Sequence, residues 1–235
     1  MIIFFFLLLF PITLFSDSFH AILAYDTISD LQSPVQKDVQ HISTFLKKLT
    51  KTTKMKLSIQ TLTGSKLCVD NVHSSLPKNH HDVLLFYYSG HGYQGQALWP
   101  SLYFSSKKEL LPAEAIRSHL ESLHPRLTIL LFDCCNNTYL FPTTPLQPKQ
   151  ISIPLSLKGP GLNSLFLNAK GTIMATGAQP GFASYAGKDG SLFTLAFLGA
   201  IKNLSSERTL SWEKVFDQMA LLCHPMQRPL SLITE

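Results

Sequence analysis

The sequence predicts one α/β domain, with a mostly parallel central sheet covered by helices on both faces. Two patterns predict this fold class in the 235-residue chain: short, continuous apolar runs recur along it, and segments with helical spacing separate them. The runs are rich in Val, Ile, Leu and aromatic residues, which is typical of strands buried on both faces. Strands that alternate with helices favour a parallel sheet, because each helix returns the chain to the edge where the next strand begins.

Each expected element has its own signal. The apolar runs predict strands at residues 19–24, 56–61, 83–88, 128–133 and 172–177. Apolar side chains repeat at helical spacing in residues 35–49, 110–123, 191–203 and 211–222. Pro34 stands just ahead of the first of these helices, Pro112 lies in the first turn of the second, and Ser211 is suited to cap the last.

Two segments depart from this alternation. Residues 1–15, MIIFFFLLLFPITLF, are too short for an unbroken membrane-spanning helix and have the length of a signal-peptide core. With small residues at Ser16 and Ser18, we expect residues 1–18 to direct export, to the periplasm or out of the cell, or to remain as a membrane anchor. The folded domain is then expected to span residues 19–235. Residues 138–170 contain five prolines and no acidic residue, which predicts a long surface loop.

Composition excludes several classes of function. The net charge is +5, but basic residues are dense only in residues 47–56, where no aromatic residues interleave with them. This pattern indicates a solvated helix end rather than a nucleic-acid surface. Four cysteines without a C-x-x-C pair predict neither a disulfide scaffold nor a structural zinc site. We therefore expect no nucleic-acid partner, no metal and no cofactor, and contact with a membrane only through an uncleaved N-terminal segment.

Two of the expected strands run into residues that carry chemistry. The run at 83–88 leads into Ser-Gly-His-Gly at 89–92, and the run at 128–133 leads into Cys134 and Cys135. Active sites of parallel sheets gather beyond the carboxyl ends of the strands, so adjacent strands would bring the His and a Cys to one crevice. An imidazole favours the thiolate, which attacks a carbonyl carbon. Either residue alone is more often structural, but the two together favour a nucleophilic pair.

These motifs resemble those of the caspase-like cysteine peptidases, and more closely those of metacaspases than of animal caspases. YYSGHG precedes a strand that ends in Asp-Cys-Cys, with His91 placed 44 residues before Cys135. The resemblance extends over roughly residues 20–235, with further matches at 171–178 (GTIMATGA), 190–194 (GSLFT) and 227–229 (QRP). It implies a three-layer caspase-like fold and an endopeptidase with Cys135 as nucleophile and His91 as base. The N–H groups of Gly92 and Cys135 would form the oxyanion hole.

The resemblance also implies a substrate class, a protein or peptide with Arg or Lys before the cleaved bond. The positions that match the metacaspase S1 pocket are Asp38, Ser89 and Asp133. Two carboxylates on a pocket floor would bind a guanidinium or ammonium through charge-assisted hydrogen bonds. The alternative is that Asp38 only begins a helix and Asp133 only fixes local backbone. Many metacaspases need calcium, but residues 93–128 contain three Glu and no Asp, so we expect no calcium site.

Three alternative interpretations remain open from the sequence alone. The chain would be a non-catalytic caspase-like scaffold or regulatory protein if the thiol were inert. It would be a caspase-like peptidase with a non-basic P1 preference if the acidic residues did not form a pocket. It would be a redox or metal-binding protein if the Cys and His residues gathered as ligands, a set that comprises Cys134, Cys135, His80, His81 and His91. In metacaspases His usually follows the nucleophile, and this chain has Asn136 there.

Overall fold

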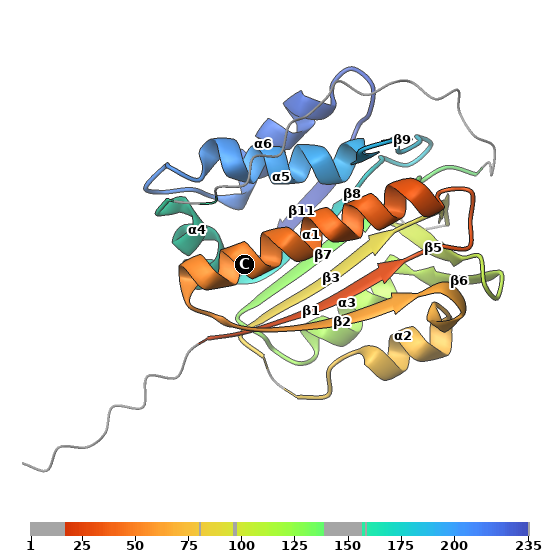
Figure 1. The fold of residues 1–235 in the computed structure, drawn as a ribbon, viewed down its shortest axis with the longest axis horizontal. Coiled ribbons are helices and arrows are strands. Elements are labelled where there is room, and N and C mark those ends of the chain that lie inside the picture. The colour runs from red at the N-terminus through yellow and green to blue at the C-terminus, as the bar shows by residue number, and fades with distance from the viewer. Residues whose placement is uncertain (1–16, 80, 96–97, 139–156, 158, 235) are drawn as a thin grey trace, which may run out of the picture.

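The central feature of the computed structural model is a six-stranded sheet in the order β11-β8-β7-β3-β1-β2 (Figure 1). The structure describes residues 17–79, 81–95, 98–138, 157 and 159–234. The strands are β1 (Ser18–Tyr25), β2 (Lys56–Thr63), β3 (Val83–Ser89), β7 (Leu127–Asp133), β8 (Gly171–Thr176) and β11 (Leu230–Thr234). All pairings within the sheet are parallel except that of β11 with β8. The mostly parallel α/β sheet expected from the sequence is confirmed.

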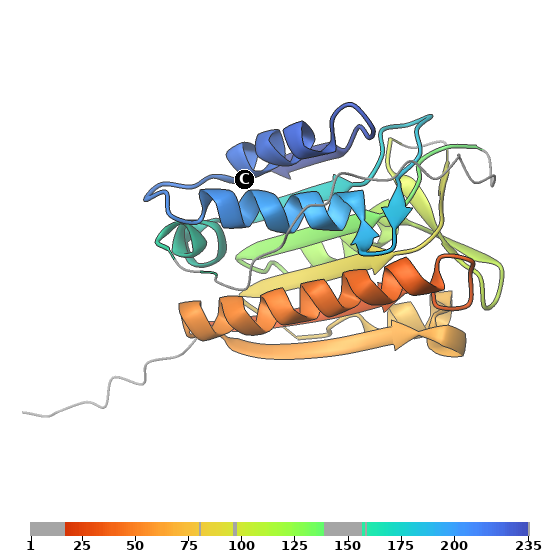
Figure 2. The same cartoon turned by 45° about the horizontal axis from the view of Figure 1, so that its top comes forward.

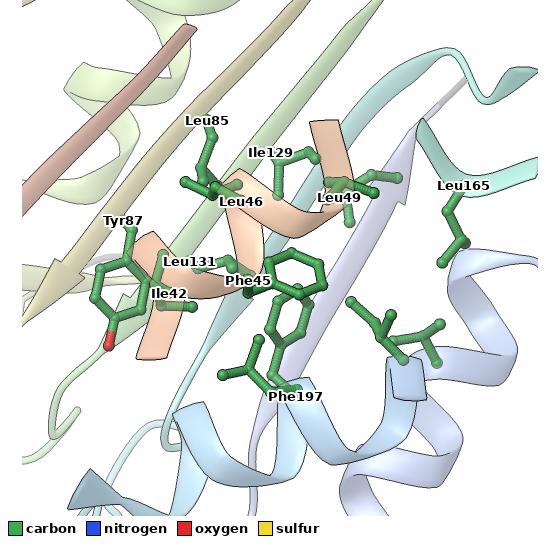
Figure 3. Packing of buried hydrophobic residues seen from close by; sticks show 14 of the residues in the cluster. Ile42, Phe45, Leu46, Leu49, Leu85, Tyr87, Ile129, Leu131, Leu165 and Phe197 are labelled. Atoms are coloured by element: carbon green, nitrogen blue, oxygen red, sulfur yellow. The ribbon is translucent and has the colours of Figure 1, made fainter. Parts of the chain in front are cut away.

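Helices cover both faces of this sheet (Figures 1 and 2). One face carries α1 (Gln32–Thr53), α5 (Leu192–Leu204) and α6 (Trp212–Cys223), and the other carries α2 (Val69–Ser75) and α3 (Ala113–Glu121). Alternate side chains of β3 supply the two cores: Leu85 faces the first and Phe86 the second. In the first core the rings of Phe45 on α1 and Phe197 on α5 meet edge to face, with centroids 6.4 Å apart (Figure 3). Both layers thus hold β3 and β7 rigidly, which fixes the residues at their ends.

The structure adds strands that the sequence did not predict. A small antiparallel sheet contains β4 (Gly92–Gln94), β5 (Pro100–Phe104) and β6 (Glu109–Pro112), and a two-stranded ribbon contains β9 (Ala186–Gly187) and β10 (Gly190–Ser191). The expected helix at 110–123 is wrong in its first turn, because Pro112 ends β6 and precedes α3. Pro34, expected just ahead of a helix, lies inside the first turn of α1, where its missing N–H has no partner to lose. A 3₁₀ turn (Gly64–Lys66) links β2 to α2.

Two further expectations about burial are wrong. β2 is an edge strand in which only Leu62 is buried, not a strand buried on both faces. The expected surface loop at 138–170 also fails in its last part, where α4 (Gly161–Asn163) continues into a π-helical turn (Ser164–Asn168). Phe166 in this turn is buried and packs against Trp212 with ring centroids 5.3 Å apart. Residues 139–156 and 158 lie outside the described residues.

Asp17 and Ser18, just ahead of the expected start of the folded domain at residue 19, already contact other segments of the fold. The N–H of Lys56 donates to the carbonyl oxygen of Asp17 at 2.8 Å. Ser18 donates to the Asp82 carboxylate from its backbone N–H at 2.7 Å and from its hydroxyl at 2.8 Å. Cleavage after Ser18 would remove these bonds. The rest of the expected export segment, residues 1–16, lies outside the described residues. Within the described ranges, no helix combines the length and the apolar character needed to cross a bilayer.

Candidate active site

The register of two neighbouring strands brings His91 and Cys135 to the same level. β3 pairs with β7 at a constant offset of 44 residues, from Val83 with Leu127 to Ser89 with Asp133. The same offset holds beyond the strand ends, where Tyr93 forms a parallel bridge with Asn137. His91 and Cys135 lie midway between these last two pairs and share the offset. The two segments therefore run side by side past the carboxyl edge of the sheet, and the adjacency of the two strands that the sequence left as a condition is met.

Gly92 allows these segments to approach closely. A Cβ atom at this position would lie 2.5 Å from the carbonyl oxygen of Cys135 and 2.6 Å from the sulfur of Cys134. Real Cβ atoms do not make contacts this short, so only glycine fits at this position. On either side the two segments are tied by hydrogen bonds, from Gly90 N to Asp133 O at 3.2 Å and from Gln94 N to Asn137 O at 2.8 Å.

The hydrogen bonds of neighbouring residues fix the direction of the Gly92 N–H. Tyr103 N donates to His91 O at 3.0 Å, so Gly92 and Leu102 form a non-hydrogen-bonded pair of the antiparallel β4–β5 ladder. The N–H of Gly92 therefore points away from β5. It points to the side where Gly90 and Gln94 donate, which is the side of residues 133–137. A backbone donor thus lies beside Cys135, where an oxyanion hole requires one.

The two adjacent cysteines lie in different environments. Cys134 is only 1% exposed, and burial raises the pKa of its thiol well above the ordinary value. Cys135 is partly exposed, and its sulfur accepts the N–H of Ser184 at 3.3 Å. Burial raises the pKa of the Cys135 thiol, the N–H of Ser184 partly offsets this, and the charge of Asp133 adds to it. Cys135 is therefore the more exposed of the two cysteines, and its raised pKa means that a base is needed to form the thiolate.

The imidazole of His91 has a carboxylate as its partner. Its Nε2 lies 2.7 Å from Oδ1 of Asp30, which precedes α1. In the part of the chain that the structure describes, the imidazole and the Cys135 thiol are not hydrogen-bonded to each other. Catalytic hydrogen bonds of this kind often form only when substrate binds. The structure thus places the two expected residues at the same height on neighbouring segments. Without a substrate, their side chains do not form a hydrogen bond with each other.

The three expected S1 residues do come together, around a buried pair of carboxyl groups. Asp38 of α1 accepts the hydroxyl of Ser89 at 2.9 Å and the N–H of Ser191 at 2.7 Å. Asp133, at the end of β7, accepts the hydroxyl of Thr194 at 2.6 Å and that of Ser191. The exposed fractions of Asp38 and Asp133 are only 0% and 4%, so both carboxyls are shielded from water.

Burial dominates the electrostatics of this carboxyl pair. It raises the pKa of Asp38 well above 3.8, and the nearby charge of Asp133 raises it further, while hydrogen bonds from Ser191 and Ser89 oppose the shift. Burial likewise raises the pKa of Asp133 against the hydrogen bonds that it accepts. Two buried carboxyls this close favour a shared proton or an added cation. Both shifts mean that the two carboxyls resist ionisation where they are buried.

This shift predicts a pH-dependent stability. Because the pKa of Asp38 lies above 3.8 in the folded protein, the fold holds a proton that the unfolded chain releases as the pH rises past that value. The free energy of unfolding therefore falls as the pH rises. In Asp38→Asn the side chain cannot ionise, so this part of the fall is absent. Urea unfolding between about pH 4 and pH 8 should show the stability difference moving in favour of the variant. A pH-independent difference, as expected for exposed Asp217→Asn, would contradict it.

Sequence reasoning missed the residues that organise the site from the segment after β8. Ser184 donates its N–H to the Cys135 sulfur, and its hydroxyl donates to Asp133 at 3.2 Å. The buried Gln227 holds this segment, since its Nε2 donates to Gly177 O at 2.7 Å and its Oε1 accepts Tyr185 N at 2.8 Å. In the sequence, Gln227 appeared only as one letter of a weak motif, and Ser184 carried no signal.

The metal-binding alternative has no support among the described residues, which contain no group of three or more Cys, His, Asp or Glu able to hold an ion. His81 stacks on His20 with ring centroids 4.9 Å apart, and both lie at the amino ends of strands, away from Cys135. His80 lies outside the described residues. Asn136, which replaces the family's His, is fully buried and donates its Nδ2 to Leu98 O at 3.0 Å. It therefore fixes backbone next to the nucleophile.

Comparison with known proteins gives a family and a structural relative. A family model described as the caspase domain matches residues 21–225. The crystal structure of protein GSU0716 from Geobacter sulfurreducens aligns with a TM-score of 0.61 at 13% sequence identity and covers 92% of each chain, a likeness of fold alone. No curated protein matched in sequence. Because the family model spans most of the chain, the protein belongs to the caspase domain family.

Proposed function

We propose that the protein is a cysteine endopeptidase of the metacaspase type that cleaves peptide bonds after Arg or Lys. The observation that carries this proposal is the position of the carboxyl pair relative to the thiol. Ser184 contacts the Cys135 sulfur through its N–H and the Asp133 carboxyl through its hydroxyl. Ser184 thus lies between the thiol and the carboxyl, so a cation bound at Asp133 and Asp38 would lie close to the nucleophile. The P1 side chain of a substrate must occupy such a position.

The reaction follows from the residues at the sheet edge. His91 takes the proton of the Cys135 thiol, and the resulting thiolate attacks the carbonyl carbon of the substrate. The N–H groups of Gly92 and Cys135 stabilise the negative charge that forms on the carbonyl oxygen. His91 then gives its proton to the amine as the peptide bond breaks. Water, deprotonated by His91, hydrolyses the thioester left on Cys135 and restores the thiol.

Specificity for a basic P1 residue follows from the raised pKa values of Asp38 and Asp133. Without a substrate the pair favours a neutral, proton-sharing state, because two buried negative charges repel each other. A guanidinium or ammonium replaces that proton and forms charge-assisted hydrogen bonds to both carboxylates. An Asp side chain in the same pocket would add a third negative charge without a counterion.

The test is a set of fluorogenic peptides that differ only at P1, with Arg, Lys, Leu or Asp. We expect kcat/KM for Arg and Lys to exceed that for Leu and Asp by at least about 100-fold, because only a cationic side chain forms charge-assisted hydrogen bonds to the carboxyl pair. A preference for Asp or Leu would contradict the basic specificity. No turnover of any peptide, together with no labelling of Cys135 by a thiol reagent, would instead favour a non-catalytic scaffold.

A further inference from the structure

We propose that Asp30 is a positioning residue that holds the His91 imidazole in the tautomer and orientation required of the catalytic base. This inference rests on the proposed peptidase function. The carboxylate accepts the hydrogen of Nε2 at 2.7 Å, and the side chains of His91 and Asp30 are 23% and 69% exposed. A salt bridge this exposed contributes little by itself in most proteins. The case for Asp30 therefore depends on how firmly its loop is held.

The loop between β1 and α1 is anchored at its start by Asp26, which is only 2% exposed. The N–H of Asp26 donates to Ser89 O at 3.0 Å, which ties the loop to the end of β3, two residues before His91. The Asp26 carboxylate accepts Ile28 N at 3.1 Å within the loop and Ser105 N at 3.3 Å after β5. The loop is thus fixed to the end of β3, which precedes His91, and to the segment after β5.

The other end of the loop is equally constrained. Ser29 donates its hydroxyl to Asp26 O at 3.2 Å and accepts Leu31 N at 3.3 Å. Helix α1 then begins at Gln32, whose N–H donates to Ser29 O at 3.2 Å. Asp30 lies between these contacts, so its backbone loses little conformational freedom when the carboxylate binds the imidazole. This pre-organisation distinguishes it from an ordinary surface acid.

The chemical consequence concerns the second nitrogen of the ring. When Nε2 carries the hydrogen that Asp30 accepts, Nδ1 is the unprotonated nitrogen and can accept the proton of the Cys135 thiol. When the imidazolium forms, the carboxylate balances its charge. Without Asp30 the ring samples the other tautomer and other orientations, so fewer molecules are ready to react. Since water reaches Asp30, we expect a moderate effect on catalysis and none on the binding of the P1 side chain.

Kinetics of Asp30→Ala, Asp30→Asn and Asp30→Glu test this role. We expect Asp30→Ala to lower kcat about fivefold with KM unchanged, in line with the modest energies of exposed ion pairs. Asp30→Glu should recover most of kcat because it restores the carboxylate, and Asp30→Asn should fall between the two. Asp217→Ala, the same substitution on the exposed side of α6, serves as control and should leave kcat unchanged. An unchanged kcat in Asp30→Ala, or a loss expressed only in KM, would overturn the proposal.

A second readout does not depend on turnover. Two-bond ¹H–¹⁵N NMR spectra report which imidazole nitrogen is protonated, and the His91 signals are assigned by their absence in His91→Gln. We expect a single Nε2-protonated tautomer in the unmodified protein and in Cys135→Ala, and a mixture of tautomers in Asp30→Ala. An Nδ1-protonated ring, or identical spectra with and without Asp30, would overturn the positioning role. A protein that shows the expected tautomer but cleaves no peptide would contradict the proposed function alone.

Discussion

Cys135→Ala is expected to abolish peptidase activity, lowering kcat/KM by about 10⁴-fold or more, as loss of a nucleophile does in other hydrolases. Cys134→Ala should keep most of the activity. The two residues are adjacent, but Cys134 is buried against Gly92, whereas Cys135 is partly exposed and its sulfur contacts Ser184. Removing the Cys134 sulfur leaves a small cavity, which costs stability of about 1 kcal/mol rather than chemistry.

A fluorogenic peptide with Arg at P1 measures this contrast, and urea unfolding shows whether each variant remains folded. Mass spectrometry after iodoacetamide treatment provides a second readout, because only an accessible thiol reacts quickly. We expect modification of Cys135 in the unmodified protein and none at Cys134. Full activity of Cys135→Ala, or loss of activity only in Cys134→Ala, would show that the accessible sulfur is not the nucleophile.

Asp38→Asn is expected to lower kcat/KM for Arg and Lys substrates by about 30- to 150-fold. This range corresponds to about 2–3 kcal/mol for one lost charge-assisted hydrogen bond to a buried cation. The substitution suits the local geometry: the amide oxygen can still accept Ser191 N, and the Ser89 hydroxyl can rotate to accept from the amide nitrogen. The fold is therefore retained while one of the two carboxylates is lost.

The matched experiment measures an Arg and a Leu peptide with the same variant. We expect a large loss for Arg and little change for Leu, so that the ratio between the two substrates falls. Asp217→Asn on the surface of α6 is the control for the loss of one negative charge. An equal loss for both peptides would mean that Asp38 supports the fold of the site rather than the recognition of a cation.

Much of the fold was readable in the sequence because its strands are continuous apolar runs. β3 and β7 are fully buried and most of their side chains are apolar, so the runs stood out. His91 and Cys135 could be paired before the fold was known because each follows the end of an apolar run. Their spacing in the sequence equals the register offset of β3 and β7. The cluster of Asp38, Ser89 and Asp133 was identified only through the family resemblance.

The remaining features depend on contacts between distant segments, for which a single sequence carries no signal. β4 is a three-residue strand that exists because β5 pairs with it, and β2 is exposed because it lies at the sheet edge. Ser184 and Asp30 are ordinary polar residues of connecting segments until the fold places them beside Cys135 and His91. Polar residues of this kind are identified by their partners, not by local pattern.

The most direct test of the proposed site is a crystal structure of the protein with a peptide aldehyde that carries Arg at P1. We predict a hemithioacetal on the sulfur of Cys135, with its oxygen facing the N–H groups of Gly92 and Cys135. The guanidinium should lie against the carboxylates of Asp38 and Asp133. An aldehyde left unreacted in the cleft, an adduct on another cysteine, or a guanidinium bound away from the two carboxylates would contradict the account.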